Sequence, residues 1–355
     1  MNLLQDITIL DFTRLLPGPL ATHLLSQMGA KVIKIEHPKR MDYVRWQGPQ
    51  IEGESVLFRM LNHRKECQTI SYDCLEGRKE ILALAKEADV IIEQFRPDVM
   101  AKWNLSFEDF KAVNPKLVYV SLTGYGQAGN MSQEAGHDIN YMAYSGLLSL
   151  NKDENGKPIV PGFQVADIAG AYMAVNAVLA GVISSLKRGT GKHLDVSLTD
   201  SIAPFLTIPI SLVWSEMKHD MFNIINGKTL VNYTVYQCEC KKWIAVGALE
   251  LKFWNNICDV LEKPNWKRDS QMELSIYQFP KKEVEALFLS QKREDWLSLF
   301  QEKDVCVSPV LEMEEVENFI LQKDRKTFGQ HQTEKGTNFK DISLPIKEKR
   351  NPSDF

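Results

Sequence analysis

The sequence has no uninterrupted apolar stretch of 18 residues, and no basic segment followed by an apolar one at its N-terminus. These absences argue against a membrane-spanning segment and a secretory leader, so we expect a cytoplasmic protein with no membrane partner. Positive charge is also not in excess, because the formal net charge is −4. Nucleic-acid binding, which depends on a basic surface, is therefore not expected either.

Cysteine is scarce, and its spacing does not indicate a metal centre. None of the six cysteines forms a C-x-x-C pair. Cys238 and Cys240 lie two residues apart in an expected strand and would share one face. No second Cys or His pair has the spacing typical of zinc ligands. We therefore expect reduced structural thiols and no metal site.

The first strand-to-helix turn, TRLLPGP at 13–19, contains one glycine and lacks the G-x-G-x-x-G fingerprint of dinucleotide-binding proteins. NAD and FAD are therefore not predicted. The surrounding pattern still alternates short apolar strands with helices such as 17–28 and 75–86, which favours a doubly wound, Rossmann-like parallel sheet. The expected strands are 7–13, 31–36, 68–72, 89–93, 117–122 and 193–197.

A chain of 355 residues exceeds one ordinary hydrophobic core, so we expect a large and a small domain. The large α/β domain covers 1–200 and is completed by about 310–355, whose polar end we expect to wrap over a neighbour. Linker helices follow at 201–219. The small α+β domain at 220–305 contains a hairpin of strands 234–238 and 242–246, followed by helices.

Four basic residues lie in loops or just past strands, where a parallel sheet binds its ligands. They are Arg45, Arg64, Lys65 and Arg96. Together they are consistent with a ligand that carries phosphate groups. The alternative is that each is an ordinary solvated side chain.

Two ionisable residues interrupt apolar stretches in the middle of the chain. His137 follows Gly136 at the start of an apolar run, and Asp167 lies within GFQVADIAGAYMAVNAVLAGV. If the two helices begin at the same edge of the sheet, these residues form an acid/base or nucleophile pair. Otherwise Asp167 caps its helix and His137 is a core histidine.

Glu250 follows the apolar strand end AVGAL and precedes a helix. The helix dipole favours an acidic residue in a first turn, so a structural role explains it. The alternative is that its carboxylate orients a histidine and tunes its charge.

Several segments resemble the family III (CaiB/BaiF) CoA-transferases, and in particular their alpha-methylacyl-CoA racemase branch. The shared segments are LLPGPLATHLLSQMGAKVIKIEHP at 15–38, EADVIIEQFRPDVM at 87–100, SLTGYGQAG at 121–129, GHDINYMAYSG at 136–146, VADIAG around Asp167, WIAVGALELKFW at 243–254 and DVCVSPVLEMEEV at 304–316. The A-D pair is general to the family. The GHDINY and GALE strings resemble the racemase branch, because the transferases usually lack this histidine.

The resemblance implies that His137 and Asp167 are the catalytic bases and that Glu250 is the partner of His137. It also implies an interlocked homodimer with no cofactor other than the coenzyme A of the acyl-CoA substrate. This sequence has Glu36-His37-Pro38 where the family has an acidic–Arg–Pro triplet. The implied CoA contacts are His37, Ile70, Ser71, Tyr72, Asp73, Arg96, Gly136, Asp138, Ile139, Asn140 and Tyr141.

A base on one face of a carbon alpha to a thioester, and an acid on the other, would invert that carbon through an enolate. The sequence therefore predicts a racemase or epimerase of 2-methylacyl-CoA thioesters, which needs no metal. One alternative is an acyl-CoA:carboxylate CoA-transferase in which Asp167 is the covalent nucleophile. A protein that binds CoA esters without catalysis is a third interpretation.

Overall fold

A computed structural model describes residues 2–153, 155–216 and 229–349. The chain forms two compact units. The first comprises Met1–Leu206 together with Asp324–Phe355, and the second comprises Thr207–Lys323. The second unit therefore extends past the expected end at residue 305. Part of the predicted linker at 201–219 and the predicted start of the small domain at 220 lie outside the described residues.

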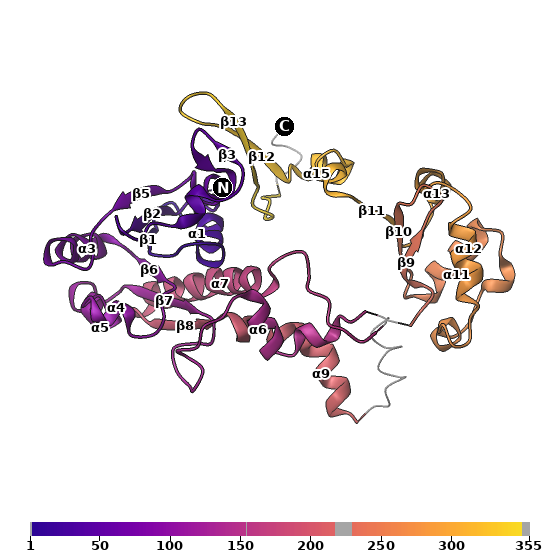
Figure 1. Cartoon of the computed structure of the whole chain (residues 1–355), viewed down its shortest axis with the longest axis horizontal. Coiled ribbons are helices and arrows are strands. Elements are labelled where there is room, and N and C mark those ends of the chain that lie inside the picture. Colours follow the sequence, from indigo (N-terminus) through magenta and orange to yellow (C-terminus); the bar gives the residue numbers. More distant parts are fainter. Residues whose placement is uncertain (1, 154, 217–228, 350–355) are drawn as a thin grey trace. The chain divides into compact units, whose positions relative to one another are not determined.

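The first unit is built on a six-stranded parallel sheet (Figure 1). Its spatial order, β5-β2-β1-β6-β7-β8, corresponds to 3-2-1-4-5-6 in chain order, which is the order of Rossmann-type sheets. The predicted parallel α/β sheet is thus confirmed. The strands are β1 Thr8–Asp11, β2 Lys31–Glu36, β5 Glu66–Thr69, β6 Val90–Glu93, β7 Val118–Thr123 and β8 His193–Ser197.

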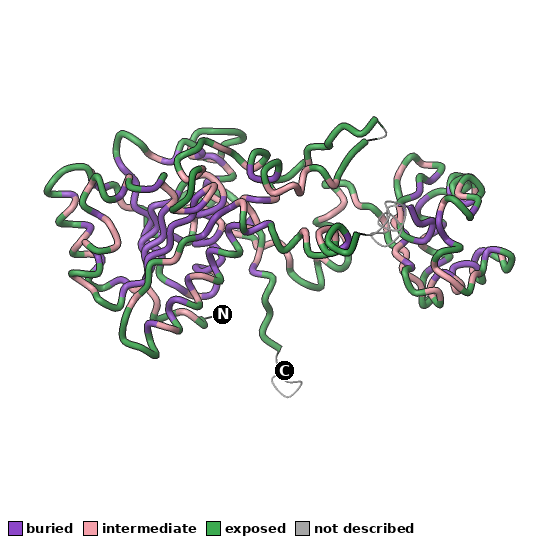
Figure 2. The backbone as a smooth tube through the Cα atoms, turned by 90° about the horizontal axis from the view of Figure 1, so that it is seen from below, coloured by how far each residue is buried: buried purple, intermediate pink, exposed green. Residues whose placement is uncertain are grey.

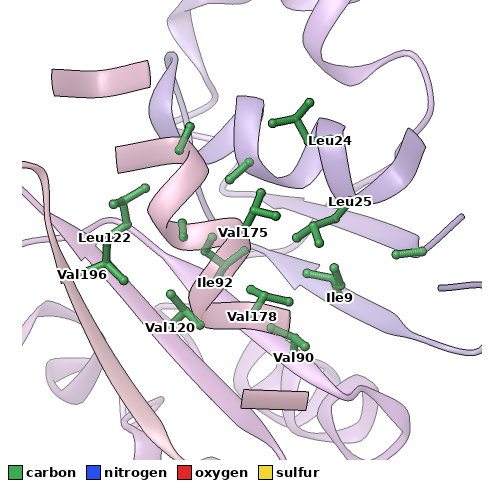
Figure 3. Close-up of a cluster of buried hydrophobic side chains, with 14 of the residues drawn as sticks. Ile9, Leu24, Leu25, Val90, Ile92, Val120, Leu122, Val175, Val178 and Val196 are labelled. Atoms are coloured by element: carbon green, nitrogen blue, oxygen red, sulfur yellow. The ribbon is translucent and has the colours of Figure 1, made fainter. Parts of the chain in front are cut away.

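Helices cover both faces of this sheet, because its central strands are apolar on both sides. Val90 and Ile92 of β6 face the core shared with α1 (Pro17–Gln27) and α7 (Val165–Arg188), as Figure 3 shows. Ile91 faces the opposite core. The helices on that side are α3 Leu75–Glu87 and α5 Phe107–Val113. The strands are accordingly the most continuously buried segments (Figure 2).

Helix α7 is the longest helix among the described residues. It is long and apolar enough to cross a membrane. An 18-residue stretch of this helix has a mean hydropathy of 1.6, and 44% of that stretch is buried in the protein. Core helices of globular proteins meet the same criterion. Here α7 packs on the sheet and α1, and two glycines allow the approach: a Cβ at Gly170 would collide with Leu198, and one at Gly181 would lie 2.5 Å from Val118.

Shorter elements complete the first unit. Part of the C-terminal segment forms an antiparallel hairpin whose second strand packs against α2 of the same chain, and the expectation that its polar end wraps over a neighbour stays a prediction. These elements are β3 Gln50–Ile51, β4 Glu54–Ser55, α2 Val56–Asn62, α4 Val99–Lys102, α6 Asp138–Tyr144, α8 Leu198–Ser201, β12 Phe328–Gln332 and β13 Asn338–Ile342.

The second unit has its own aromatic core and contains the predicted hairpin, extended by a third antiparallel strand. Tyr236 stacks on Phe288, and Phe288 meets Trp296 edge to face. The strands are β9 Tyr233–Gln237, β10 Trp243–Gly247 and β11 Val307–Val310. The helices are α9 Thr207–Trp214, α11 Leu251–Val260, α12 Lys281–Phe288, α13 Arg293–Phe300, α14 Met313–Val316 and α15 Ile320–Arg325, which runs into the first unit.

Candidate active site

His137 is the residue that precedes α6, in the segment that follows β7. Its backbone is extended, and its N–H donates to Oδ1 of Asn140 at 3.0 Å. The side-chain amide of Asn140 thus provides the acceptor for the backbone N–H at the N-terminus of α6. The imidazole is exposed. The alternative of a core histidine is therefore wrong, and the side chain is accessible to a ligand.

Asp138 joins the N-termini of two helices that are remote in sequence. Its Oδ1 accepts hydrogen bonds from the backbone N–H of Ala166 at 2.7 Å and of Asp167 at 3.1 Å. The carboxylate thus serves as an N-cap for α7. This clamp holds His137, one residue before Asp138, near Asp167, the third residue of α7.

The carboxylate of Asp167 is half-buried in the first turn of α7. Burial and, to a lesser extent, the Asp138 carboxylate raise the pKa of Asp167 to about 6, against the opposing effect of His137. Asp167 does not cap its helix, because Asp138 bonds to the N–H groups there. A carboxyl group whose pKa lies near neutrality is suited to both give and take a proton.

Replacing Asp138 by alanine is expected to lower kcat about 10²-fold, because the loss of the clamp misplaces Asp167 relative to His137. Asp138→Asn is the matched control, since it retains an acceptor oxygen for Ala166 and Asp167 while removing the charge. It should keep most of kcat. Steady-state kinetics of both variants checks this, and equal losses in the two would contradict the clamp.

Tyr141 fixes the segment before α6. Its hydroxyl donates to the carbonyl oxygen of Gly136 at 2.6 Å, and its ring lies against Gly124 and Gly136, where a Cβ would be 2.5 and 2.7 Å away. Burial, together with the charge of Asp167, raises the pKa of Tyr141 to about 12, so it remains a donor at neutral pH. The glycines therefore let the tyrosine hold the backbone next to His137.

A cavity of about 150 Å³ lies at the carboxyl ends of β1 and β2. Aromatic side chains and two arginines give it a flat apolar wall and positive charge, and the guanidinium of Arg40 stacks on Trp103 at 5.0 Å. Its lining is Phe12, Thr13, Arg14, Ile35, Glu36, His37, Arg40, Asp42, Tyr72, Phe95, Val99 and Trp103.

Two of the predicted CoA contacts, His37 and Tyr72, line this cavity. His37 is buried, accepts at Nδ1 from the N–H of Lys39, and donates from Nε2 to Asp73 at 2.8 Å. Tyr72 packs edge to face on His37. Ile70 is buried and Ser71 half-buried. Both ring nitrogens of His37 therefore bond within the protein, which favours a positioning role for His37.

The four basic residues singled out in the sequence differ in their surroundings. Arg64 and Arg96 are exposed. Arg45 pairs with Glu36 and Glu54. Lys65 is buried and pairs with Asp11 at 3.2 Å, so neither phosphate binding nor solvation describes it correctly. The positive charge of Arg96 acts to lower the pKa of Tyr141, so Arg96 lies close to this residue of α6.

Comparison with known proteins assigns this arrangement to a family. The model of CoA-transferase family III matches residues 4–355. The chain belongs to CoA-transferase family III. It is 32% identical over 320 residues to succinyl-CoA:glutarate CoA-transferase of Homo sapiens, which covers 88% of this chain and 73% of that protein. It is 29% identical over 332 residues to alpha-methylacyl-CoA racemase of Homo sapiens, covering 92% and 82%.

Solved structures support the fold of this family III member. A CAIB/BAIF family protein from Brucella suis has a TM-score of 0.80 at 24% identity, over 96% of this chain and 91% of that chain. Rv3272 from M. tuberculosis has a TM-score of 0.82 at 23% identity, over 98% and 93%. Family III thus includes both transferases and racemases among the relatives of this chain.

Glu250 belongs to the second unit, at the N-cap of α11, and its side chain does not cap that helix. Its predicted partnership with His137 stays a prediction. So do the predicted CoA contacts of Ile139 and of Asn140, both of which have exposed side chains on α6.

Sequence reasoning missed a polar row on the neighbouring strands. Glu93 of β6, Ser121 of β7 and Asp195 of β8 are in register, and Ser121 bonds to His193 at 2.9 Å. Burial raises the pKa of Glu93 to about 7. The available signal was an acidic residue at the end of the apolar strand DVIIE. The row borders a cavity of about 250 Å³ that also contacts Arg96.

Proposed function

We propose that this family III protein racemises or epimerises 2-methylacyl-CoA thioesters by 1,1-proton transfer. The observation that carries the proposal is the clamp of Asp138, which holds an exposed histidine and a carboxyl of raised pKa at two adjoining helix N-termini. An acyl transfer that uses Asp167 alone as a nucleophile has no need for His137.

Inversion requires two groups on opposite faces of the α-carbon. One group takes the α-proton as the enolate forms, and the other returns a proton to the far face. In one direction Asp167 is the base and protonated His137 the acid, and in the other direction the roles are exchanged. Backbone N–H groups at the start of α6 would stabilise the negative charge on the enolate oxygen, whereas those of Ala166 and Asp167 at the start of α7 already bond to Asp138.

In this proposal the adenine end of the CoA substrate occupies the cavity at the ends of β1 and β2. Its aromatic wall suits an adenine ring, and Arg14 and Arg40 suit phosphate groups. The interlocked homodimer and the contribution of Glu250 belong to the same proposal and rest on the family resemblance. A cytoplasmic location stays part of the proposal, on the sequence features given above.

A second candidate is CoA transfer between an acyl-CoA and a carboxylate, favoured by the 32% identity to a transferase. In that reaction the Asp167 carboxylate attacks the thioester carbonyl. An acyl–aspartyl anhydride forms, and the CoA thiolate leaves.

The two functions are separated by incubating a single enantiomer of a 2-methylacyl-CoA in deuterated water without a carboxylate acceptor. NMR should show exchange of the α-proton together with loss of chirality. Adding a carboxylate should produce no new CoA ester. Acyl transfer to the carboxylate without α-proton exchange would instead establish the transferase.

The pH dependence of racemisation is expected to be bell-shaped and the same in both directions. Both active forms share one proton between His137 and Asp167, so activity is lost when the pair holds two protons or none. The acidic limb of kcat/KM should lie near pH 6, the pKa of Asp167. Asp138→Asn should move that limb to lower pH, because it removes a charge that raises this pKa. An unmoved limb would show that another group titrates.

A further inference from the structure

Three of the seven histidines gather around one carboxylate in the first unit. His23 belongs to α1, His63 follows α2, and His331 and Asp341 belong to β12 and β13 of the C-terminal hairpin (Figure 1). Asp341 is 2% exposed and His23 is 3% exposed. The hairpin residues His331 and Asp341 are far in sequence from His23 and His63, and only folding brings the four together.

The distances in this cluster match those of metal ligands. Nε2 of His63 lies 3.5 Å from Oδ2 of Asp341, and Nε2 of His331 lies 2.8 Å from Oδ1. One ligand atom from each of these residues lies within 4.8 Å of the others. A tetrahedral zinc ion with bonds of about 2.0–2.1 Å separates its ligand atoms by roughly 3.3 Å. Small side-chain movements would therefore complete the site.

The orientation of His63 supplies a second, independent observation. Its Nδ1 lies 3.2 Å from the carbonyl oxygen of Arg59, which can only accept, so Nδ1 carries the proton. The lone pair of Nε2 then points toward Asp341. This buried Nε2 has no hydrogen-bond partner in the described part of the chain. A backbone carbonyl that fixes the tautomer in this way is typical of metal-binding histidines.

The hairpin also leaves room at the cluster. Gly329 pairs with Asp341 across the hairpin, and a Cβ there would collide with Oδ1 of Asp341 and lie 2.9 Å from Nε2 of His331. The amide of Gln27 donates to Oδ2 of Asp341 at 3.4 Å and orients the carboxylate. The glycine thus keeps the ligand atoms free of an intruding side chain.

The electrostatics of His23 and His63 suit a ligand role. Burial lowers the pKa of His23 to about 3, and burial also lowers the pKa of His63. Lys65 and Arg64 also disfavour a proton on His23, whereas Asp341 favours one. The carboxylate of Asp341 is therefore the charge that would compensate a cation.

We propose that His63, His331 and Asp341 bind a divalent metal ion of the zinc class, with His23 beside the remaining coordination position. Two imidazole nitrogens and one carboxylate oxygen favour Zn²⁺ and similar transition metals over Mg²⁺ and Ca²⁺, which prefer oxygen ligands. The ion is structural, because it links the hairpin to α2.

The test uses the full-length protein without an affinity tag, after dialysis against a chelator. Isothermal titration with Zn²⁺ should show one ion bound per chain, and Mg²⁺ should show none. His331→Ala should weaken zinc binding at least about tenfold. His193→Gln, which changes a histidine outside the cluster, should leave the affinity unchanged.

A second variant and a second measurement guard against misfolding. Gly329→Ala retains every ligand but fills the space between them, so it too should weaken zinc binding. Excess zinc should raise the Tm of the wild-type protein by roughly 2–4 °C, and should not raise that of His331→Ala. Absence of stoichiometric zinc binding by the wild-type protein, or equal affinity in His331→Ala, would overturn the proposal.

Discussion

Asp167→Asn is expected to lower kcat for racemisation about 10²–10⁴-fold, the range that a positioned acid/base group contributes. The amide can neither take nor deliver the proton. The same variant should be at least as stable as the wild type at pH 8. Burial raises the pKa of Asp167 to about 6, so the ionised carboxylate is disfavoured in the folded state, and its stability cost grows as pH rises above about 4 toward 6.

Asp295→Asn is the matched control for this substitution. Asp295 is exposed and occupies the third position of α13, as Asp167 does in α7. Its replacement should change neither kcat nor stability by a measurable factor. Chiral analysis of the product and thermal denaturation at pH 8 provide the two readouts. A fully active Asp167→Asn protein would remove Asp167 from the chemistry.

The largest effect on stability is expected at Asp11, at the end of β1. Its carboxylate pairs with Lys65 at 3.2 Å and accepts a hydrogen bond from Thr22 at 2.6 Å, and Lys34 lies nearby on β2. All four side chains are buried. Asp11→Ala leaves two buried ammonium groups without this partner, and should lower the free energy of unfolding by about 3–5 kcal/mol.

A double variant distinguishes charge from packing at this position. Asp11→Ala combined with Lys65→Met also removes the ammonium group that pairs with Asp11, whereas Lys34 keeps its ion pair with Asp42 at 3.6 Å, so the double variant should recover part of the lost stability. Urea denaturation of the single and double variants measures the difference. If the double variant is less stable than Asp11→Ala, the loss comes from packing, and the charge argument fails.

The sequence was most informative where a regular pattern was local. The strands at 31–36 and 193–197 have the predicted bounds. Apolar strands separated by helices of crossover length permit few topologies other than a parallel sheet. The positions of His137 and Asp167 at helix starts followed from the same periodicity.

Contacts between remote residues were beyond the reach of these patterns. The hydrogen bonds from α7 to Asp138 span 28 and 29 residues of sequence. Asp138 could therefore be named as a site residue from the sequence, but its hydrogen bonds to α7 could not be predicted. Lys65 looked like a loop cation because nothing local reveals its pairing with Asp11, 54 positions away. The C-terminal hairpin carries mostly polar residues, and its burial depends on α2.

The central claim is that His137 and Asp167 act on opposite faces of one α-carbon, and the most direct test is His137→Asn in deuterated water. Each 2-methylacyl-CoA enantiomer is incubated separately and followed by NMR and chiral analysis. The account predicts α-proton exchange, with retention of configuration, only for the enantiomer whose proton faces the partly exposed Asp167, and no racemisation. Racemisation at the wild-type rate, or equal exchange of both enantiomers, would contradict it.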